Sequence, residues 1–375
     1  MSPASQGAVP QQKVHQYRCP GCAADVAFEP KEGALACPYC GRVEAIPQNA
    51  EQVEERSYEA YLCEIPRQMD RLSQQALEVS CQACGSVFAF EPPEVAGACP
   101  FCGSAVVSQP RSSDPLTAPE GILPFRVTKE QAAESIRKWL STRWFAPNAL
   151  KRLARQGALA GMYVPFWTYD SHTVSYYTGE RGEYYYTTET YTDTDSQGRR
   201  VTRTRQVRHT RWYPASGRVS RWFDDVLVPA TTSISRARLE ALEPWDLGSL
   251  KPYDPAFLAG HKAQRYQVGL AAGFETAKAA MARVIRRDVE ADIGGDEQRV
   301  HHIATSYSGV TFKHLLLPVW ISAYRFQAKV YQVLVNARTG EVQGERPYSA
   351  WKIAGLVLLI LAVVLAFLIL RDRVG

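Results

Sequence analysis

Eight of the nine cysteines fall into four Cys-x-x-Cys pairs, which form two copies of one pattern. The first copy holds Cys19, Cys22, Cys37 and Cys40, and the second holds Cys81, Cys84, Cys99 and Cys102. Two residues between thiolates let one tight turn present both sulfurs to one ion, and two such turns complete a four-thiolate zinc site. The spacing therefore predicts two structural Zn²⁺ ions, because four thiolates leave no open coordination position.

An offset of 62 residues relates the two copies and also aligns residues around the cysteines. It places the Phe-Glu-Pro triplet beginning at Phe28 on the one beginning at Phe90, and Gly41 on Gly103. We therefore predict zinc ribbons at residues 17–47 and 79–109, folded by metal binding worth ~10–16 kcal/mol in small zinc domains. A redox dithiol is the alternative, but it needs one Cys-x-x-Cys at the start of a helix. Cys63, between the copies, is interpreted as a bystander.

Charge is divided unevenly along the chain of 375 residues, whose formal net charge is +5. Residues 1–121 carry 8 Lys+Arg and 15 Asp+Glu, whereas residues 122–350 carry 32 and 22. Contact with nucleic acid requires Lys and Arg that neutralise phosphates. Ribbons this acidic favour protein contacts or a purely structural role, and nucleic acid is an unlikely partner.

The elements around the ribbons begin with residues 1–16, which lack the apolar run of a signal peptide and are expected to be disordered. At the other end, residues 353–370 are 18 consecutive residues without a charge. As a helix they would reach ~27 Å, close to the ~30 Å hydrocarbon thickness of a bilayer. The flanking residues are suited to membrane interfaces: Trp351, Lys352, Arg371 and Arg373.

We expect one transmembrane helix over residues 351–371, followed by a tail at 372–375. Zinc thiolates favour a reducing compartment. The sequence thus predicts a single-pass protein of the cytoplasmic membrane with its N-terminal bulk in the cytoplasm. A buried core helix is the alternative interpretation of the apolar run.

The middle of the chain predicts a mixed α+β domain over residues 122–350, with a helical spacer at 48–78 and a linker at 110–121. Thr128 and Gln131 form a capping-box pattern ahead of a helix that would end near residue 144. Residues 164–228 are rich in Tyr, Thr and Val and predict a β-hairpin with its turn near 196–198. Further helices are expected at 235–242 and 255–293, with a break of the second near 269–273 as an alternative, and further strands at 300–312, 315–326 and 329–335. The fold class is α+β: two four-cysteine zinc ribbons, a domain of mixed antiparallel sheet and helices, and a C-terminal transmembrane helix.

The two arms of the predicted hairpin carry opposite charges. Residues 180–195 hold five acids and one Arg, whereas residues 199–221 hold eight Arg and no acid. Cross-strand ion pairs would explain the pattern. The alternative is contact with a membrane or anionic surface, where each nearby basic residue adds ~1 kcal/mol; its candidate residues are Arg203, Arg205, Arg208 and Arg211. A third interpretation is a nucleic-acid-binding strand.

Motifs for catalysis are missing from the sequence. It contains no G-x-x-x-x-G-K-[ST], G-x-G-x-x-G, H-E-x-x-H or G-x-S-x-G. Asp170 and His172 are expected on one strand face, but no nucleophile accompanies them. We therefore predict that the protein is not an enzyme and has no catalytic residue.

Short motifs along almost the whole chain resemble a bacterial family. They are the CPxCG knuckles at 37–41 and 99–103 and segments at 123–125, 163–167, 244–247, 312–314, 317–320 and 336–349. The chain is similar to tail-anchored double zinc-ribbon proteins, labelled transcription-factor-IIB-type zinc ribbon proteins, primosomal protein N′-like or helicase-like. The helicase label is contradicted here by the missing phosphate loop.

The resemblance implies membrane lipids, stomatin/prohibitin-like proteins and phage-shock-protein-A-like proteins as partners, in envelope stress or membrane maintenance. The favoured hypothesis is a non-enzymatic zinc-ribbon adaptor at the cytoplasmic membrane that recruits proteins. The alternative is a nucleic-acid-binding replication accessory without motor activity.

Overall fold

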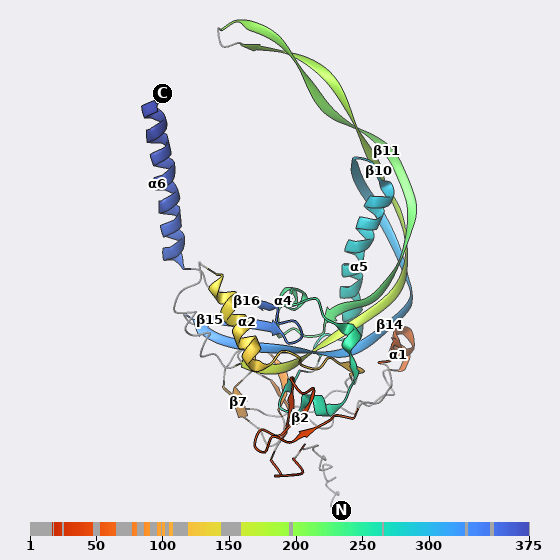
Figure 1. Cartoon of the computed structure of the whole chain (residues 1–375). Coiled ribbons are helices and arrows are strands. Elements are labelled where there is room, and N and C mark those ends of the chain that lie inside the picture. The colour runs from red at the N-terminus through yellow and green to blue at the C-terminus, as the bar shows by residue number, and fades with distance from the viewer. Residues whose placement is uncertain are drawn as a thin grey trace, which may run out of the picture.

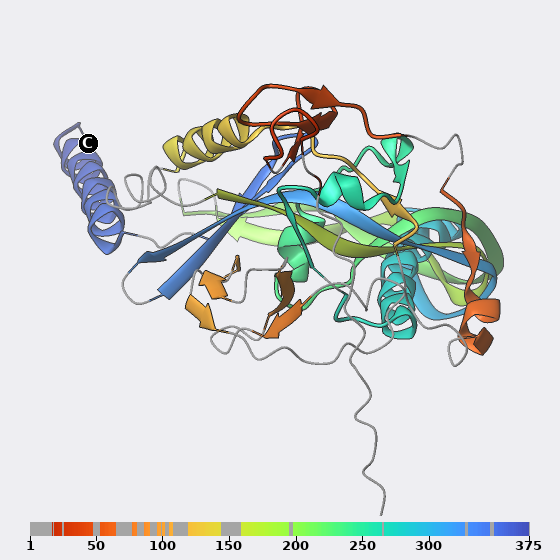
Figure 2. The ribbon, with the colours of Figure 1, turned by 90° about the horizontal axis from the view of Figure 1, so that it is seen from below.

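The computed structural model contains a long curved β-sheet with helices against it and a small cysteine ribbon at its lower side (Figures 1 and 2). This arrangement is α+β, as predicted. The structure describes residues 17, 19–24, 26–47, 53–64, 77–80, 86–90, 96–98, 100–101, 105–107, 119–143, 159–194, 198–264, 266–326, 329–345 and 349–374. The expected disordered residues 1–16 and nearly all of the linker at 110–121 lie outside these ranges.

Five antiparallel strands form the central path of a nine-stranded sheet among the described residues, in the order β11-β10-β14-β15-β16. They are β10 (Leu159–Thr194), β11 (Arg200–Pro229), β14 (Glu297–Phe326), β15 (Lys329–Asn336) and β16 (Val342–Gly344). The hairpin of β10 and β11 confirms the predicted β region. The separate strands expected at 300–312 and 315–326 are wrong, because Lys313 and His314 continue the pairing with Thr168 and Trp167 inside one strand.

The central part of the sheet is covered on both faces. On β10, Met162, Val164 and Phe166 belong to one buried cluster with α4 (Arg236–Glu240). Tyr163, between them, belongs to a second cluster with α2 (Lys129–Ser141). Successive strand side chains point to opposite faces, so β10 is buried almost continuously here.

Helix α2 begins at the predicted capping box. The Thr128 N–H donates to Gln131 Oε1 (2.9 Å), and the Gln131 N–H donates to Thr128 Oγ1 (3.3 Å). Its Ala132, Ile136 and Leu140 are buried, at the three- and four-residue spacing of one apolar helix face.

Helix α5 (Leu270–Ile293) packs against the sheet along β10, β11 and β14 (Figure 1). It buries Ala277, Met281, Ile285 and Val289 against the aromatic side chains of the strands. The helix starts later than the expected residue 255. Before it lie the 3₁₀ turn η4 (Pro255–Leu258) and β13 (Lys262–Ala263). The Ala256 N–H at the start of η4 donates to Asp254 Oδ1 (2.8 Å).

Beyond the body, β10 and β11 continue as a two-stranded projection (Figure 1). Pairing between β10 and β14 reaches Gly182, whereas pairing between β10 and β11 continues to Thr194 and Arg200. The hairpin therefore outruns the sheet that supports its base.

The N-terminal segments repeat one local structure. The first copy has β1 (Ala27–Glu29), β2 (Ala34–Ala36) and β3 (Val43–Glu44), and the second has β5 (Leu77–Ser80), β6 (Val87–Phe90), β7 (Ala96–Ala98) and β8 (Ala105–Val107). Shifted back by 62 residues, the pairs Gly97↔Val106 and Ala98↔Ala105 of β7 and β8 fall on the pairs Leu35↔Glu44 and Ala36↔Val43 of β2 and β3. The repeat therefore extends from sequence to strand register.

The spacer expected at 48–78 is not helical throughout. It contains β4 (Arg56–Ser57), which pairs with β14, and the short helix α1 (Tyr58–Glu64). Tyr58 and Tyr61 pack against the buried cluster under α5. Its polar composition suggested a free helix, but these aromatic residues attach the segment to the sheet.

The C-terminal helix α6 (Ala350–Val374) stands apart from the sheet (Figures 1 and 2). Within the described part of the chain, no helix combines the length and apolar character that crossing a membrane requires. The side chains of α6 are described for residues 351–365. The remainder of the span predicted at 351–371 lies outside them, so that span stays a prediction.

Candidate metal centre

Cys19, Cys22, Cys37 and Cys40 converge as the spacing predicts. All four sulfurs lie within 4.8 Å of one another. Cys19 Sγ is 3.4 Å from Cys40 Sγ, and Cys22 Sγ is 3.4 Å from Cys37 Sγ. Zn–S bonds of ~2.3 Å in a tetrahedron place sulfurs just under ~4 Å apart. The four thiols therefore fit one zinc ion, which would have no open coordination position.

Backbone turns hold the sulfurs in place. Ahead of β1, the Ala23 N–H donates to the Cys19 carbonyl (2.8 Å), and between β2 and β3 the Gly41 N–H donates to the Cys37 carbonyl (3.0 Å). Gly41 has φ +74°, the left-handed conformation that glycine adopts freely. Ala23 reaches φ +57° at the matching place, so the same turn forms there without a glycine.

Two thiols are prepared for metal binding by the backbone. Hydrogen bonds from the N–H groups of Cys40 and, more weakly, Tyr39 lower the pKa of Cys37 to about 6, against the opposing effect of burial. The N–H of Gly21 lowers the pKa of Cys19 in the same way. Thiolates are the form that binds zinc, so these turns favour the ligand form of Cys19 and Cys37. Against the lowering effect of backbone N–H groups, hydrogen bonds with the neighbouring thiols raise the pKa of Cys22 and Cys40.

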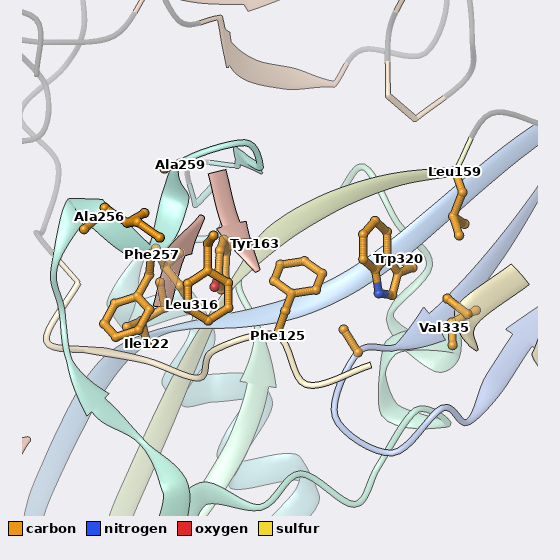
Figure 3. Packing of buried hydrophobic residues seen from close by; sticks show 14 of the residues in the cluster. Ile122, Phe125, Leu159, Tyr163, Ala256, Phe257, Ala259, Leu316, Trp320 and Val335 are labelled. Atoms are coloured by element: carbon orange, nitrogen blue, oxygen red, sulfur yellow. The ribbon is translucent and has the colours of Figure 1, made fainter. Parts of the chain in front are cut away.

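The first ribbon is docked on the body and is not a free appendage. Its Phe28 is 3% exposed and packs edge-on against Phe257, with ring centroids 5.5 Å apart. The Phe28 N–H donates to the Ala259 carbonyl (2.9 Å). Figure 3 shows the body side of this cluster, where Phe257 lies beside Tyr163 and Leu316, and Phe125 lies between Tyr163 and Trp320. The metal centre and the sheet therefore share one hydrophobic core.

The second cysteine quartet lies outside the described residues: Cys81, Cys84, Cys99 and Cys102. The strands around it are described, and β5–β6 and β7–β8 flank its two knuckles. One four-cysteine cluster that could bind one zinc ion is thus observed, and the second zinc stays a prediction. Cys63 is exposed on α1, away from the first cluster.

The basic strand of the hairpin meets its own acidic neighbour. Arg203 lies 3.3 Å from Asp193, and Arg205 lies 3.0 Å from Glu189. The other two candidate arginines stack on tyrosine rings: Arg208 lies 4.2 Å from the Tyr184 centroid and Arg211 5.0 Å from the Tyr185 centroid. Cross-strand pairing therefore accounts for part of the charge pattern. Contact of these arginines with an anionic surface stays a prediction.

The residues expected at membrane interfaces flank α6. Trp351 is 89% exposed at the start of the helix, and Lys352 beside it is partly buried. Arg371 and Arg373 belong to the last turns of α6, where side chains lie outside the described part. Their predicted role is untested.

An acidic cluster at the base of the hairpin escaped the sequence reasoning. Carboxylate oxygens of Glu55, Asp170 and Asp224 lie within 4.8 Å of one another. Lys313, 7% exposed, partly neutralises this negative charge through ion pairs with Glu55 (3.1 Å) and the neighbouring Asp225 (2.7 Å). Burial acts to lower the pKa of Lys313, but the ion pairs raise it overall. This buried lysine makes the cluster a structural ion-pair network.

A β-bulge lies beside Asp170. From Asp170 to His172, a two-residue step on β10 pairs with a three-residue step on β14, from Thr311 to Ser308, so the extra residue belongs to β14. The expectation that Asp170 and His172 share a strand face stays a prediction. Asp170 is 1% exposed and accepts hydrogen bonds from the Asp225 N–H and from Thr311 Oγ1 (2.9 Å). Desolvation raises its pKa to about 6. A bulge leaves no pattern in sequence periodicity. The one signal for this network was Lys313, a charged residue between Phe312 and the apolar residues that begin at Leu315.

Comparison with known proteins gives one informative relative. "Uncharacterized protein YdjG" from Bacillus subtilis (strain 168) is 27% identical over 349 residues, covering 90% of this chain and 92% of that protein. No protein-family model matches the chain, and no solved structure matches it. Because the match spans nearly both chains, it includes the α+β body and is not an isolated cysteine motif.

Proposed function

We propose that this protein is a non-enzymatic adaptor, held at a membrane by its C-terminal segment, that presents zinc ribbons to protein partners. The observation that carries the proposal is the closed four-cysteine cluster packed into the core of the body. Four thiolates would saturate a zinc ion and leave no place for a substrate. Such a centre stabilises a surface and performs no reaction.

A membrane tether is supported by the exposed apolar surface of α6. Eight Val, Leu and Ile side chains between residues 357 and 365 are 48–66% exposed. An apolar surface of this kind requires a lipid or protein cover. The sequence continues without a charge to Leu370, a length that suits a bilayer better than a protein groove. Trp351 would lie at the interface.

The tether is tested by extracting cell membranes with alkaline carbonate. The full chain should remain in the pellet, and Leu359→Arg with Val363→Arg should move to the supernatant, since each central Arg costs ~3 kcal/mol of insertion. Trp351→Phe is the matched control and should stay in the pellet. Recovery of the unchanged chain in the supernatant would refute the tether.

The docking role is tested by affinity capture from detergent-solubilised membranes. The full chain is compared with Cys19→Ser plus Cys37→Ser, which dismantles the first ribbon, and with Cys63→Ser, which leaves it intact. We expect partners that only the unchanged chain and Cys63→Ser retain. The family resemblance points to stomatin/prohibitin-like and phage-shock-protein-A-like proteins among them. Identical partner sets for all three chains would refute recruitment by the ribbon.

The nucleic-acid alternative has weaker support. Arg203 and Arg205 are already paired with acids of the neighbouring strand, which reduces the charge available to phosphates. It predicts affinity for DNA or RNA that falls steeply with salt and is lost in Arg208→Ala with Arg211→Ala. Absence of binding at low salt would exclude it.

A further inference from the structure

The free part of the β10–β11 hairpin consists of residues 183–194 and 200–211, and is called the arm below. At its base the Tyr184 N–H donates to Asp296 Oδ2 (2.7 Å), and the Asp296 N–H donates to the Gly182 carbonyl (2.8 Å). These bonds close the end of the β14 ladder. Beyond them, among the described strands, β10 and β11 pair only with each other.

An arm of this length is an unusual structure to leave alone in water. Its paired residues extend for roughly 40 Å at about 3.3 Å per residue. A two-stranded ribbon without a covered face is marginally stable by itself. Each outer edge also presents a row of backbone N–H and C=O groups that can accept another strand.

The charges along the arm are sorted by strand. On β10, the acids Glu183, Glu189 and Asp193 share one face because they are separated by even numbers of residues. Directly across, Glu183 pairs with Arg211 and Glu189 with Arg205, and Tyr191 pairs with Arg203, which places these three arginines on the same face. Arg200 and Arg208 pair with Thr194 and Tyr186 and therefore lie on the opposite face. One row of anions therefore lies beside one row of cations, each next to a different outer edge.

This separation of charge determines which strand edges of two arms can pair. Pairing β11 with β11 would bring two rows of arginine together, and pairing β10 with β10 would bring two rows of acids together. Like charges opposite one another destabilise a sheet, and opposite charges stabilise it. Pairing β10 of one arm with β11 of another continues the alternation of anions and cations.

We infer that the arm is an assembly element, through which the β10 edge of one copy of this chain pairs with the β11 edge of a second copy. The contact is head-to-tail, since two different edges meet. Antiparallel pairing requires neighbouring arms to point the same way. Successive copies would therefore form a ring or a curved row with all bodies at one side.

A flat anionic surface fits the arm less well. On the face of Glu183, Glu189 and Asp193, such a surface would meet these acids together with the arginines, and two of the arginines, Arg203 and Arg205, are already paired with Asp193 and Glu189. The opposite face offers it two arginines of the described arm, Arg200 and Arg208. A second copy instead gives every acid row a further row of arginines. The same chemistry thus favours another arm over a lipid headgroup or a phosphate backbone.

The test uses the full chain in detergent micelles, with its mass measured by light scattering over a concentration series. Variant one carries Glu183→Arg, Glu189→Arg and Asp193→Arg, and variant two carries Arg203→Glu, Arg205→Glu and Arg211→Glu. Each makes both edges alike in charge, so the association constant should fall roughly a hundredfold. The unchanged chain should form oligomers.

One mixture and one further variant keep the test independent of folding defects. Variants one and two together should co-assemble, because each supplies the charge that the other lacks. A third variant with all six changes restores opposite rows and should assemble like the unchanged chain. Association through α6 or the ribbons would be the same in all of these chains, so failure of the tether or of recruitment does not affect this readout.

Three results would overturn the inference. One is an unchanged chain that is monomeric at every concentration, and another is self-association of either charge variant at full strength. The third is a monomer whose arm binds vesicles of pure phosphatidylglycerol, or a DNA duplex, with a loss of binding in variant two. That outcome would assign the arm to an anionic surface instead.

Discussion

Replacing Phe28 by Ala should separate the first zinc ribbon from the body without removing its metal. The side chain lies on β1, between the two knuckles, and is not a ligand. It is 3% exposed and contacts Phe257 and His261 with ring centroids 5.5 and 6.5 Å away. The Phe28 ring is therefore a main packing contact between the metal centre and the sheet.

The expected cost follows from what the ring loses. Truncating a buried Phe to Ala lowers the free energy of unfolding by about 3–5 kcal/mol, which includes the cavity left behind. The edge-on contact with Phe257 contributes about 0.5–1.5 kcal/mol of this. The hydrogen bond from the Phe28 N–H to Ala259 can survive, so we expect about 3–4 kcal/mol.

Urea unfolding of the purified chain, followed by tryptophan fluorescence, measures the loss, and a chromophoric chelator measures zinc content and its rate of release. Tyr39→Ala is the matched control, since Tyr39 is an aromatic residue of the same ribbon with 82% exposure. We expect unchanged zinc content and faster release in Phe28→Ala. A loss no larger than that of Tyr39→Ala would refute the docking of the ribbon.

Three further changes test the same core and the buried charges. Gly260→Ala should cost about 1–3 kcal/mol in urea unfolding, because φ is +79° and its Cβ would lie 2.6 Å from the Ala27 Cβ; Ala27→Gly should recover part of this, and no recovery would contradict the clash. Burial raises the pKa of Asp170 to about 6, so its protonated carboxyl contributes fully to stability below about pH 4, and this contribution is lost as the pH rises through about 6. Between pH 4 and 7, the free energy of unfolding of Asp170→Asn should therefore rise by about 3 kcal/mol relative to that of the unchanged chain. Burial lowers the pKa of His261 to about 4, so the unchanged chain gains stability from this residue as the pH rises from 4 to 7. The free energy of unfolding of His261→Gln should therefore fall by about 3 kcal/mol relative to that of the unchanged chain over this range. For either variant, a plot of unfolding free energy against pH that runs parallel to that of the unchanged chain would contradict the pKa shift.

Local patterns in the sequence predicted elements well. The capping box at Thr128 predicted the start of α2, which begins at Lys129. The first cysteine quartet converges because its ligands lie in one small ribbon, where spacing determines geometry. Such signals are local, so no long-range contact could overrule them.

Features that depend on distant partners were not predictable. Residues 48–78 were expected to form a helical spacer, but β4 pairs with β14, more than two hundred residues later. The continuity of β14 through Lys313 depends on carboxylates supplied by Glu55 and Asp225 from other segments. In the sequence, a lysine after an apolar run predicts the end of a buried strand, because its carboxylate partners are not visible there.

Pairing of β4 with β14 also has a consequence for synthesis. Thr311 leaves the ribosome about 250 residues after Ser57, which at 5–20 residues per second is roughly 12–50 s. Through that interval the emerging N-terminal segment has no strand to join. The sheet can therefore be completed at β4 only after most of the chain has been synthesised.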